Sequence, residues 1–164
     1  MRELLQKIKR INLKEAKNLV LFDTCFVINI LEHHKHLDKL KDRNIGITSF
    51  NMEELLHVEH KLSHEDKKLI RAFLKHANFC VVEIPVHPGD YEGERAFVSS
   101  VDENLLKRVH DPSDAVLIAV AIKTRSIVLT KDKHHLFTVE LKDFLEKYNL
   151  KVYKDLNFLS TRQT

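Results

Sequence analysis

Short apolar runs alternate with segments of helical periodicity along this chain, and this alternation limits the fold more than any other feature. Residues 19–22 (Leu-Val-Leu-Phe) are wholly apolar, as expected of a central strand that is covered on both faces. Further strands are predicted over residues 45–48, 79–84, 126–129 and 151–153. Strands that alternate with helices form βαβ units, so we expect an α/β protein with three layers, α/β/α, around a central, mainly parallel sheet.

The helices are predicted from apolar spacing and from start signals. A first amphipathic helix over residues 2–10 follows from the spacing of Leu4, Leu5, Ile8 and Ile11. Ser63, with Asp66 three residues later, resembles a capping box. Asp111 followed by Pro112 predicts a helix start with Asp111 as the N-cap. The helix behind it, over residues 115–122, is apolar on all sides and should be buried, whereas one or two helices are predicted within residues 87–109.

A length of 164 residues fits one domain with its own core. Only three Gly and three Pro are present, which excludes long flexible linkers. We expect an amphipathic helical leader over residues 1–17, a folded domain over residues 18–157 and a C-terminal tail over residues 158–164.

Composition and charge narrow the cellular setting. No apolar stretch is long enough to span a bilayer, and the charged residues among positions 1–4 argue against a signal peptide. The two cysteines, Cys25 and Cys80, lie in apolar runs and need no disulfide, which fits a reducing cytoplasm. A formal net charge of +3 permits a nucleic-acid partner without requiring one.

Carboxylates follow the predicted strands closely. Asp23 comes directly after the first strand, Asp132 lies just beyond the fourth, and Glu53 and Glu54 lie in the first turns after the second. In an open parallel sheet, ligands bind outside the carboxyl ends of the strands where the strand order reverses. The pattern places these four residues at that end. Asp114, in the first turn of the buried helix, joins them only if its helix begins at the same edge.

Several carboxylates brought together without a cation would repel one another, and some would take up protons. Mg²⁺ and Mn²⁺ favour carboxylate and water oxygens, and such ions can activate a water and stabilise the oxygens of a phosphodiester. No His/Cys set has the spacing of a zinc site. The acids therefore favour phosphoryl chemistry with Mg²⁺ or Mn²⁺.

Four segments resemble motifs of one known family. They are residues 21–28 (LFDTCFVI), 47–55 (ITSFNMEEL), 114–121 (DAVLIAVA) and 127–132 (IVLTKD). In this order they are similar to the PIN domains, which include VapC-type toxins and RNA-processing nucleases, and the resemblance extends over about residues 18 to 153. It implies that residues 18–157 form a PIN-like nuclease domain.

The resemblance also implies a function and a set of residues. The site would be a metal-dependent endoribonuclease centre that cleaves single-stranded RNA with water as the nucleophile. Its Mg²⁺ or Mn²⁺ would be held by Asp23, Glu54, Asp114 and Asp132. Thr24 and Thr130 would support these carboxylates or face the phosphate. A homodimer, and an antitoxin or an RNA-processing partner, are implied in the same way.

Basic residues beside Asp132 are candidates for contacts with RNA phosphates. They are Lys131, Lys133 and His134, and Arg125 is a further one. Phosphate contacts carry no sequence specificity. Base stacking is not predicted, because the chain has no Trp and no aromatic motif of the RNP type.

Each acid also has a purely structural interpretation. Asp23 could only cap the helix that follows it, Asp114 is favoured by the helix dipole at its position, and Asp132 could simply end a strand. Helical geometry does not choose between Glu53 and Glu54; only the family spacing favours Glu54. Cys25 stands where Asn or Ser is commonest in the family, which weakens a polar role for that position. The histidine-rich segments are typical of solvated surface.

Other function classes fit less well. A PIN-like domain without catalysis, serving as an RNA-binding or scaffold module, is the alternative that the acids leave open. A phosphoacceptor receiver domain needs an acidic pair after the first strand and an Asp after the third, and residues 81–85 offer no Asp. A haloacid-dehalogenase-type phosphatase needs D-x-D after the first strand, which Asp23-Thr24-Cys25 lacks.

Overall fold

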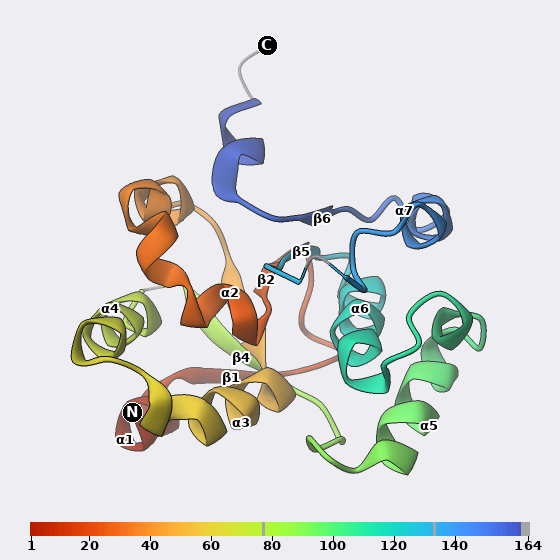
Figure 1. The fold of residues 1–164 in the computed structure, drawn as a ribbon, viewed down its shortest axis with the longest axis horizontal. Coiled ribbons are helices and arrows are strands. Elements are labelled where there is room, and N and C mark those ends of the chain that lie inside the picture. Colours follow the sequence, from red (N-terminus) through yellow and green to blue (C-terminus); the bar gives the residue numbers. More distant parts are fainter. Residues whose placement is uncertain (77, 133, 162–164) are drawn as a thin grey trace.

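A six-stranded sheet forms the centre of the computed structural model, which describes residues 1–76, 78–132 and 134–161 (Figure 1). The strands lie in the order β1-β4-β3-β2-β5-β6, and every neighbouring pair is parallel. Their bounds are β1 Lys9–Asn12, β2 Val20–Phe22, β3 Ile45–Thr48, β4 Phe79–Glu83, β5 Ile127–Leu129 and β6 Val152–Tyr153. The predicted α/β class with a central parallel sheet is confirmed.

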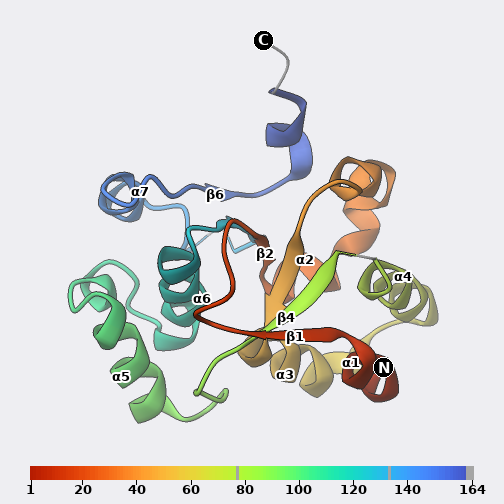
Figure 2. The same cartoon turned by 180° about the vertical axis from the view of Figure 1, so that it is seen from behind.

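Helices cover both faces of this sheet, which gives the predicted three layers (Figures 1 and 2). One face carries α1 Arg2–Lys7, α2 Thr24–Ile28, the 3-10 helix η1 Ile30–Leu40, α3 Ser49–Val58 and α4 His64–Leu74. The other carries α5 Tyr91–Val101, α6 Pro112–Thr124 and α7 Val139–Glu146. Three short 3-10 helices complete the described chain: η2 Glu59–Lys61, η3 Leu105–Lys107 and η4 Leu156–Thr161.

Strand β2 shows why two cores form. Its alternate side chains point to opposite faces. Val20 and Phe22 pack with the helices of the first face, and Leu21 packs with those of the second. All three are buried, which explains the uninterrupted apolar run in the sequence. Among the residues that the structure describes, no helix is both long and apolar enough to cross a membrane.

The N-terminal segment corrects the predicted helix over residues 2–10. Helix α1 ends at Lys7, and Lys9–Asn12 form β1, which pairs with β4 at the edge of the sheet. Ile11 is the only partly buried residue of this strand, so β1 has no clear strand pattern and its isoleucine happens to continue the helical spacing of Leu4 and Leu5. Residues 1–17 are therefore not a purely helical leader, and Leu5 is buried in the core of the first face.

Two predicted helix starts are confirmed. The Ser63 hydroxyl accepts the Asp66 N–H, and the Asp66 carboxylate accepts the Ser63 N–H, which is the reciprocal capping box. Asp111 caps α6 by accepting the Ser113 N–H at 2.9 Å, with Pro112 in the first turn. The helix that follows Asp23 is short: α2 ends at Ile28 and the chain continues as η1.

The order of the strands determines where a ligand can bind. The chain adds β3 on one side of β2 and, after returning, β5 on the other side. Where the strand order reverses in this way, the connections leave neighbouring strands toward opposite faces of the sheet. A crevice for a ligand then forms outside the carboxyl ends of these strands. The carboxyl end of β2, followed at once by Asp23, is therefore the switch point of this sheet.

Candidate active site

The four predicted acids line one cavity of about 300 Å³ at the switch point. They come from four separate segments: Asp23 follows β2, Glu54 lies in α3, Asp114 lies in the first turn of α6 and Asp132 follows β5. Helix α6 therefore begins at the edge where the strands end, which the sequence left open. None of the described residues that line the cavity carries a basic side chain.

Asp23 occupies the N-cap position of α2, yet its side chain does not cap that helix. Its Oδ2 atom accepts the Thr130 hydroxyl at 2.6 Å and lies 3.0 Å from the Cys25 Sγ atom. Its Oδ1 atom lies 3.4 Å from the Asn51 amide nitrogen. The carboxylate is thus oriented by side chains around the cavity, and the simple capping interpretation does not account for its position.

Cys25 has polar contacts that the sequence did not indicate. Besides Asp23, its sulfur lies 3.3 Å from the Thr130 hydroxyl and accepts the Lys131 N–H at 3.2 Å. Burial, followed by the nearby negative charge of Asp23, raises the pKa of the Cys25 thiol to about 12. The thiol therefore stays protonated at neutral pH and can donate to Asp23.

Glu54, and not Glu53, faces the cavity. Its Oε2 atom accepts the Thr24 hydroxyl at 2.7 Å and the Asn51 amide at 3.1 Å. Burial, together with repulsion from Asp23, raises the pKa of Glu54 against the effect of these two donors. Glu53 instead pairs with His87 on the surface, with 2.8 Å between Oε1 and Nδ1.

Asp114 has a pKa that is shifted far from its ordinary value. Burial, followed by repulsion from Asp111, Asp132 and Asp23, raises its pKa to about 7. The imidazole of His135 acts on the pKa of Asp114 in the opposite direction. The sensitivity of Asp114 to two of the other cavity acids shows that their charges act on one another.

Asp132 lines the cavity and also accepts backbone hydrogen bonds from the residues that follow it. Its two carboxylate oxygens accept the N–H groups of His134 and His135, at 2.9 and 3.1 Å. Its own N–H donates to the Thr130 hydroxyl at 3.0 Å. Because Thr130 also donates to Asp23, this one hydroxyl connects the acids that follow β2 and β5.

The donor set suits a hard divalent cation in charge and chemistry. In residues 1–76, 78–132 and 134–161, however, no three His, Cys, Asp or Glu side chains come close enough together to hold a metal ion directly. Mg²⁺ commonly keeps several waters and is bound through one or two carboxylates. The cavity of about 300 Å³ has room for such a hydrated ion among the four acids.

Two polar residues of the site were missed at the level of sequence. Asn51 is 3% exposed, and its amide contacts Asp23, Thr24 and Glu54. Glu94, in α5, is completely buried and accepts the Gly89 N–H and the Ser113 hydroxyl. The position of Asn51 three residues before Glu54 puts both on one side of α3, which is the one signal that could have identified it.

Neither of the lysines predicted to contact phosphate, Lys131 and Lys133, is among the described residues that line the acidic cavity. Lys131 is partly buried, and its side chain does not line the acidic cavity. Lys133 lies outside the described residues. The threonines, by contrast, both take part: Thr24 donates to Glu54, and Thr130 donates to Asp23.

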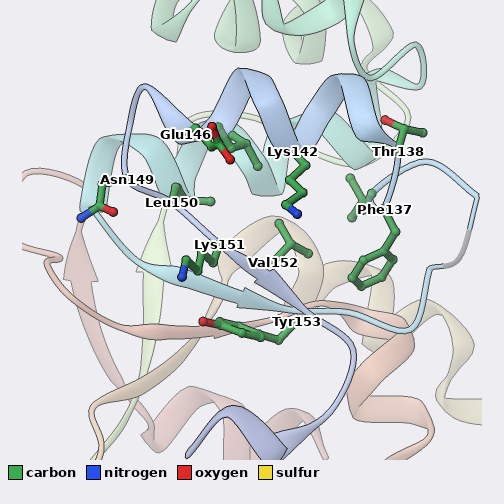
Figure 3. Close-up of a pocket in the computed structure, with 11 residues that line it drawn as sticks. Phe137, Thr138, Lys142, Glu146, Asn149, Leu150, Lys151, Val152 and Tyr153 are labelled. Atoms are coloured by element: carbon green, nitrogen blue, oxygen red, sulfur yellow. The ribbon is translucent and has the colours of Figure 1, made fainter. Parts of the chain in front are cut away.

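A second cavity, of about 360 Å³, lies between α7 and β6 (Figure 3). Its lining is largely apolar, with Phe137 and Val152 among the side chains that surround it. Glu146 is the one carboxylate in this lining. The chemistry expected of clustered acids therefore belongs to the cavity at the switch point.

Two solved structures contain chains that are similar to this one. A chain of the VapBC2 structure from Rickettsia felis, bound to a DNA fragment from its promoter, is similar with a TM-score of 0.51 and 12% identity. The match covers 82% of the present chain and 97% of that one, and it shows a shared fold. A chain of a toxin-antitoxin complex from Klebsiella pneumoniae matches with a TM-score of 0.48 and 16% identity, over 73% and 92% of the two chains.

No curated protein matches the sequence significantly. The family model of the PIN domain, however, matches residues 20–139, which include β2 to β5 and all four cavity acids. The match covers well over half of the sequence. This chain belongs to the PIN domain family.

Proposed function

We propose that this protein is a metal-dependent nuclease that hydrolyses single-stranded RNA. The observation that carries the proposal is the cavity at the switch point, which is lined by Asp23, Glu54, Asp114 and Asp132 and, within the described part of the chain, by no basic side chain. Membership of the PIN domain family supports it. The raised pKa of Asp114 also supports it, because a divalent cation would relieve the repulsion that contributes to it.

In this proposal Asp23, Glu54, Asp114 and Asp132 would hold a hydrated Mg²⁺ or Mn²⁺ among them, and the bound ion would supply an activated water and neutralise charge on the phosphodiester. Thr130 and Cys25 orient the carboxylate of Asp23, and Thr24 and Asn51 orient that of Glu54. Asp114 would have to release its proton in order to act as a ligand. No side chain forms a covalent intermediate, so water is the nucleophile.

Cleavage of a labelled single-stranded RNA with Mg²⁺ or Mn²⁺ tests the proposal. Asp23→Asn keeps the size of the side chain and removes one negative charge, and we expect it to abolish cleavage. Asp42→Asn, at an exposed position outside the cavity, is the matched control and should cleave like the wild type. Equal cleavage by the Asp23→Asn variant and the wild type would remove the claim.

One observation favours a second function, that of an RNA-binding or scaffold module without catalysis. Within the described part of the chain, no three potential ligands are close enough together to hold a metal directly. Calorimetric titration with Mn²⁺ separates the two proposals. No binding at millimolar Mn²⁺, together with RNA binding, favours the module.

The biological role that we propose is that of a toxin held by an antitoxin, in the cytoplasm, with RNA processing as the alternative. The shared fold with a chain of the R. felis VapBC2 structure motivates this choice. We also propose a homodimer, on family grounds alone. Induced expression of the wild type should arrest growth while Asp23→Asn does not; unimpaired growth with active enzyme would favour the processing role.

A further inference from the structure

Beside the acidic cavity lies a further cavity, of about 310 Å³, that is lined mainly by basic residues. Among the described residues, its lining contains five basic side chains: Lys107, Arg108, His110, His134 and His135. The other described lining residues are Thr138 and Glu140, so one carboxylate among them faces the basic groups. We name this the basic pocket.

The two cavities adjoin each other because the same two chain segments form both. One segment runs from Lys107 to His110 in the basic pocket and reaches Ser113 and Asp114 in the acidic cavity three residues later. The other starts at Asp132 in the acidic cavity and continues into His134 and His135.

Asp132 fixes this junction directly. Its carboxylate accepts the backbone N–H groups of His134 and His135, so the turn that carries both imidazoles is held against an acid of the cavity. These two hydrogen bonds connect the lining of the basic pocket directly to the acidic cavity.

A phosphate chain is the ligand that fits a basic pocket next to an acidic one. The acidic cavity repels phosphates until a cation enters, so an RNA strand needs compensating positive charge close by. Lys107 and Arg108 are exposed and supply permanent charge. Imidazole is the only aromatic ring among the described residues of this lining, so the pocket offers contacts to the RNA backbone and not stacking of bases.

We propose that the basic pocket binds a backbone phosphate of the RNA next to the scissile phosphodiester. This inference rests on the proposed nuclease function, since it concerns the same substrate. It assigns Lys107 and Arg108, with the imidazoles around them, to the binding of the strand and not to the chemical step. Binding through them is independent of base sequence and sensitive to salt.

Binding is measured apart from cleavage, in an Asp23→Asn background with chelator, by fluorescence anisotropy of a labelled single-stranded RNA. We expect Lys107→Ala/Arg108→Ala to weaken binding on the order of tenfold in low salt. The slope of log affinity against log salt should become shallower by roughly 0.7 for each phosphate that is no longer neutralised, or about 1.4 for two. Lys68→Ala/Arg71→Ala, which removes an exposed Lys and an exposed Arg from α4, should change neither quantity.

Equal affinities and salt slopes for the Lys107/Arg108 variant and its control would overturn the proposal. So would displacement of the RNA by polyglutamate of matched charge as effectively as by unlabelled RNA, because the pocket would then suit an acidic protein segment. Cleavage by the otherwise wild-type chain is scored separately. Weakened binding without any metal-dependent cleavage retains the basic pocket and rejects the nuclease, whereas cleavage with unchanged binding does the reverse.

Discussion

At the scale of single residues, Asp114 links the site to pH. Its pKa rises from 3.8 to about 7 on folding, so the folded protein holds this proton more tightly than the unfolded chain. The associated stability is fully present below about pH 4 and is lost as the pH rises through 7. In the absence of metal, the protein should therefore become less stable between pH 4 and pH 8.

Asp114→Asn removes the charge that causes this loss. We expect the variant to be more stable than the wild type at pH 8, by about 1–2 kcal/mol once solvent screening of the partly exposed carboxyl is included, and close to it at pH 4. Urea denaturation with chelator measures both. Asp42→Asn serves as the control, and an equal gain at both pH values would contradict the explanation.

Asn51 connects two of the cavity acids, because its side-chain amide nitrogen lies 3.4 Å from Oδ1 of Asp23 and donates to Glu54. Replacing it with Asp removes the donors to Thr24 and Glu54 and adds a buried carboxylate between two others. We expect the free energy of unfolding at pH 8 to fall by about 3 kcal/mol or more. Asn44→Asp, at an exposed position before β3, is the matched control in the same urea experiment. A comparable loss in both variants would show that Asn51 has no special role.

At the scale of elements, α1 and β1 decide whether the N-terminus is part of the core. Leu5 is 2% exposed, whereas its neighbour Leu4 is only partly buried. If α1 is integral, Leu5→Ala should destabilise the protein by about 2–4 kcal/mol and Leu4→Ala by clearly less. Thermal or urea unfolding measures the difference. Two small and equal effects would mean that the segment is a separable leader.

The elements that could be predicted are those with a distinctive local sequence pattern. The run at residues 19–22 is apolar because β2 is covered on both faces, and Asp111-Pro112 is a favoured pair for the start of a helix. Strand β1 was not predictable, because an edge strand with exposed Lys9 and Arg10 needs no apolar alternation. Tertiary pairing with β4 selects the strand there, and no local signal reports it.

The same reasoning applies to the site. Asp23 and Asp132 could be placed from the sequence, since an acid directly after a strand, or a few residues beyond it, lies near the end of the sheet. Glu94 could not, because nothing in the sequence of α5 indicates that its start packs against Ser113 at the start of α6. The basic pocket could not be predicted from the sequence for a related reason. Lys107 and His135 are far apart in sequence, and only the fold brings them into one pocket.

At the scale of the whole molecule, the proposed binding of a metal ion in the acidic cavity would stabilise the folded protein. An ion that binds only the folded protein stabilises it, by about 2.7 kcal/mol at a concentration one hundred times its Kd. We expect Mn²⁺ to raise the melting temperature of the wild type, more at pH 8 than at pH 5.5 because Asp114 must release a proton. Asp23→Asn should lose most of this shift. The same rise with NaCl of equal ionic strength would contradict site binding.

The position of β2 between β3 and β5 also has a consequence for synthesis on the ribosome. A nascent chain that has emerged only as far as α6 contains three of the four acids. Its strand β2, however, still lacks β5, its hydrogen-bonding partner on one side. Asp132 arrives only with the segment that closes that side. A translation product that ends before Asp132 therefore lacks one of the four cavity acids. Under the proposed nuclease function, only chains whose synthesis has passed β5 would carry the complete site.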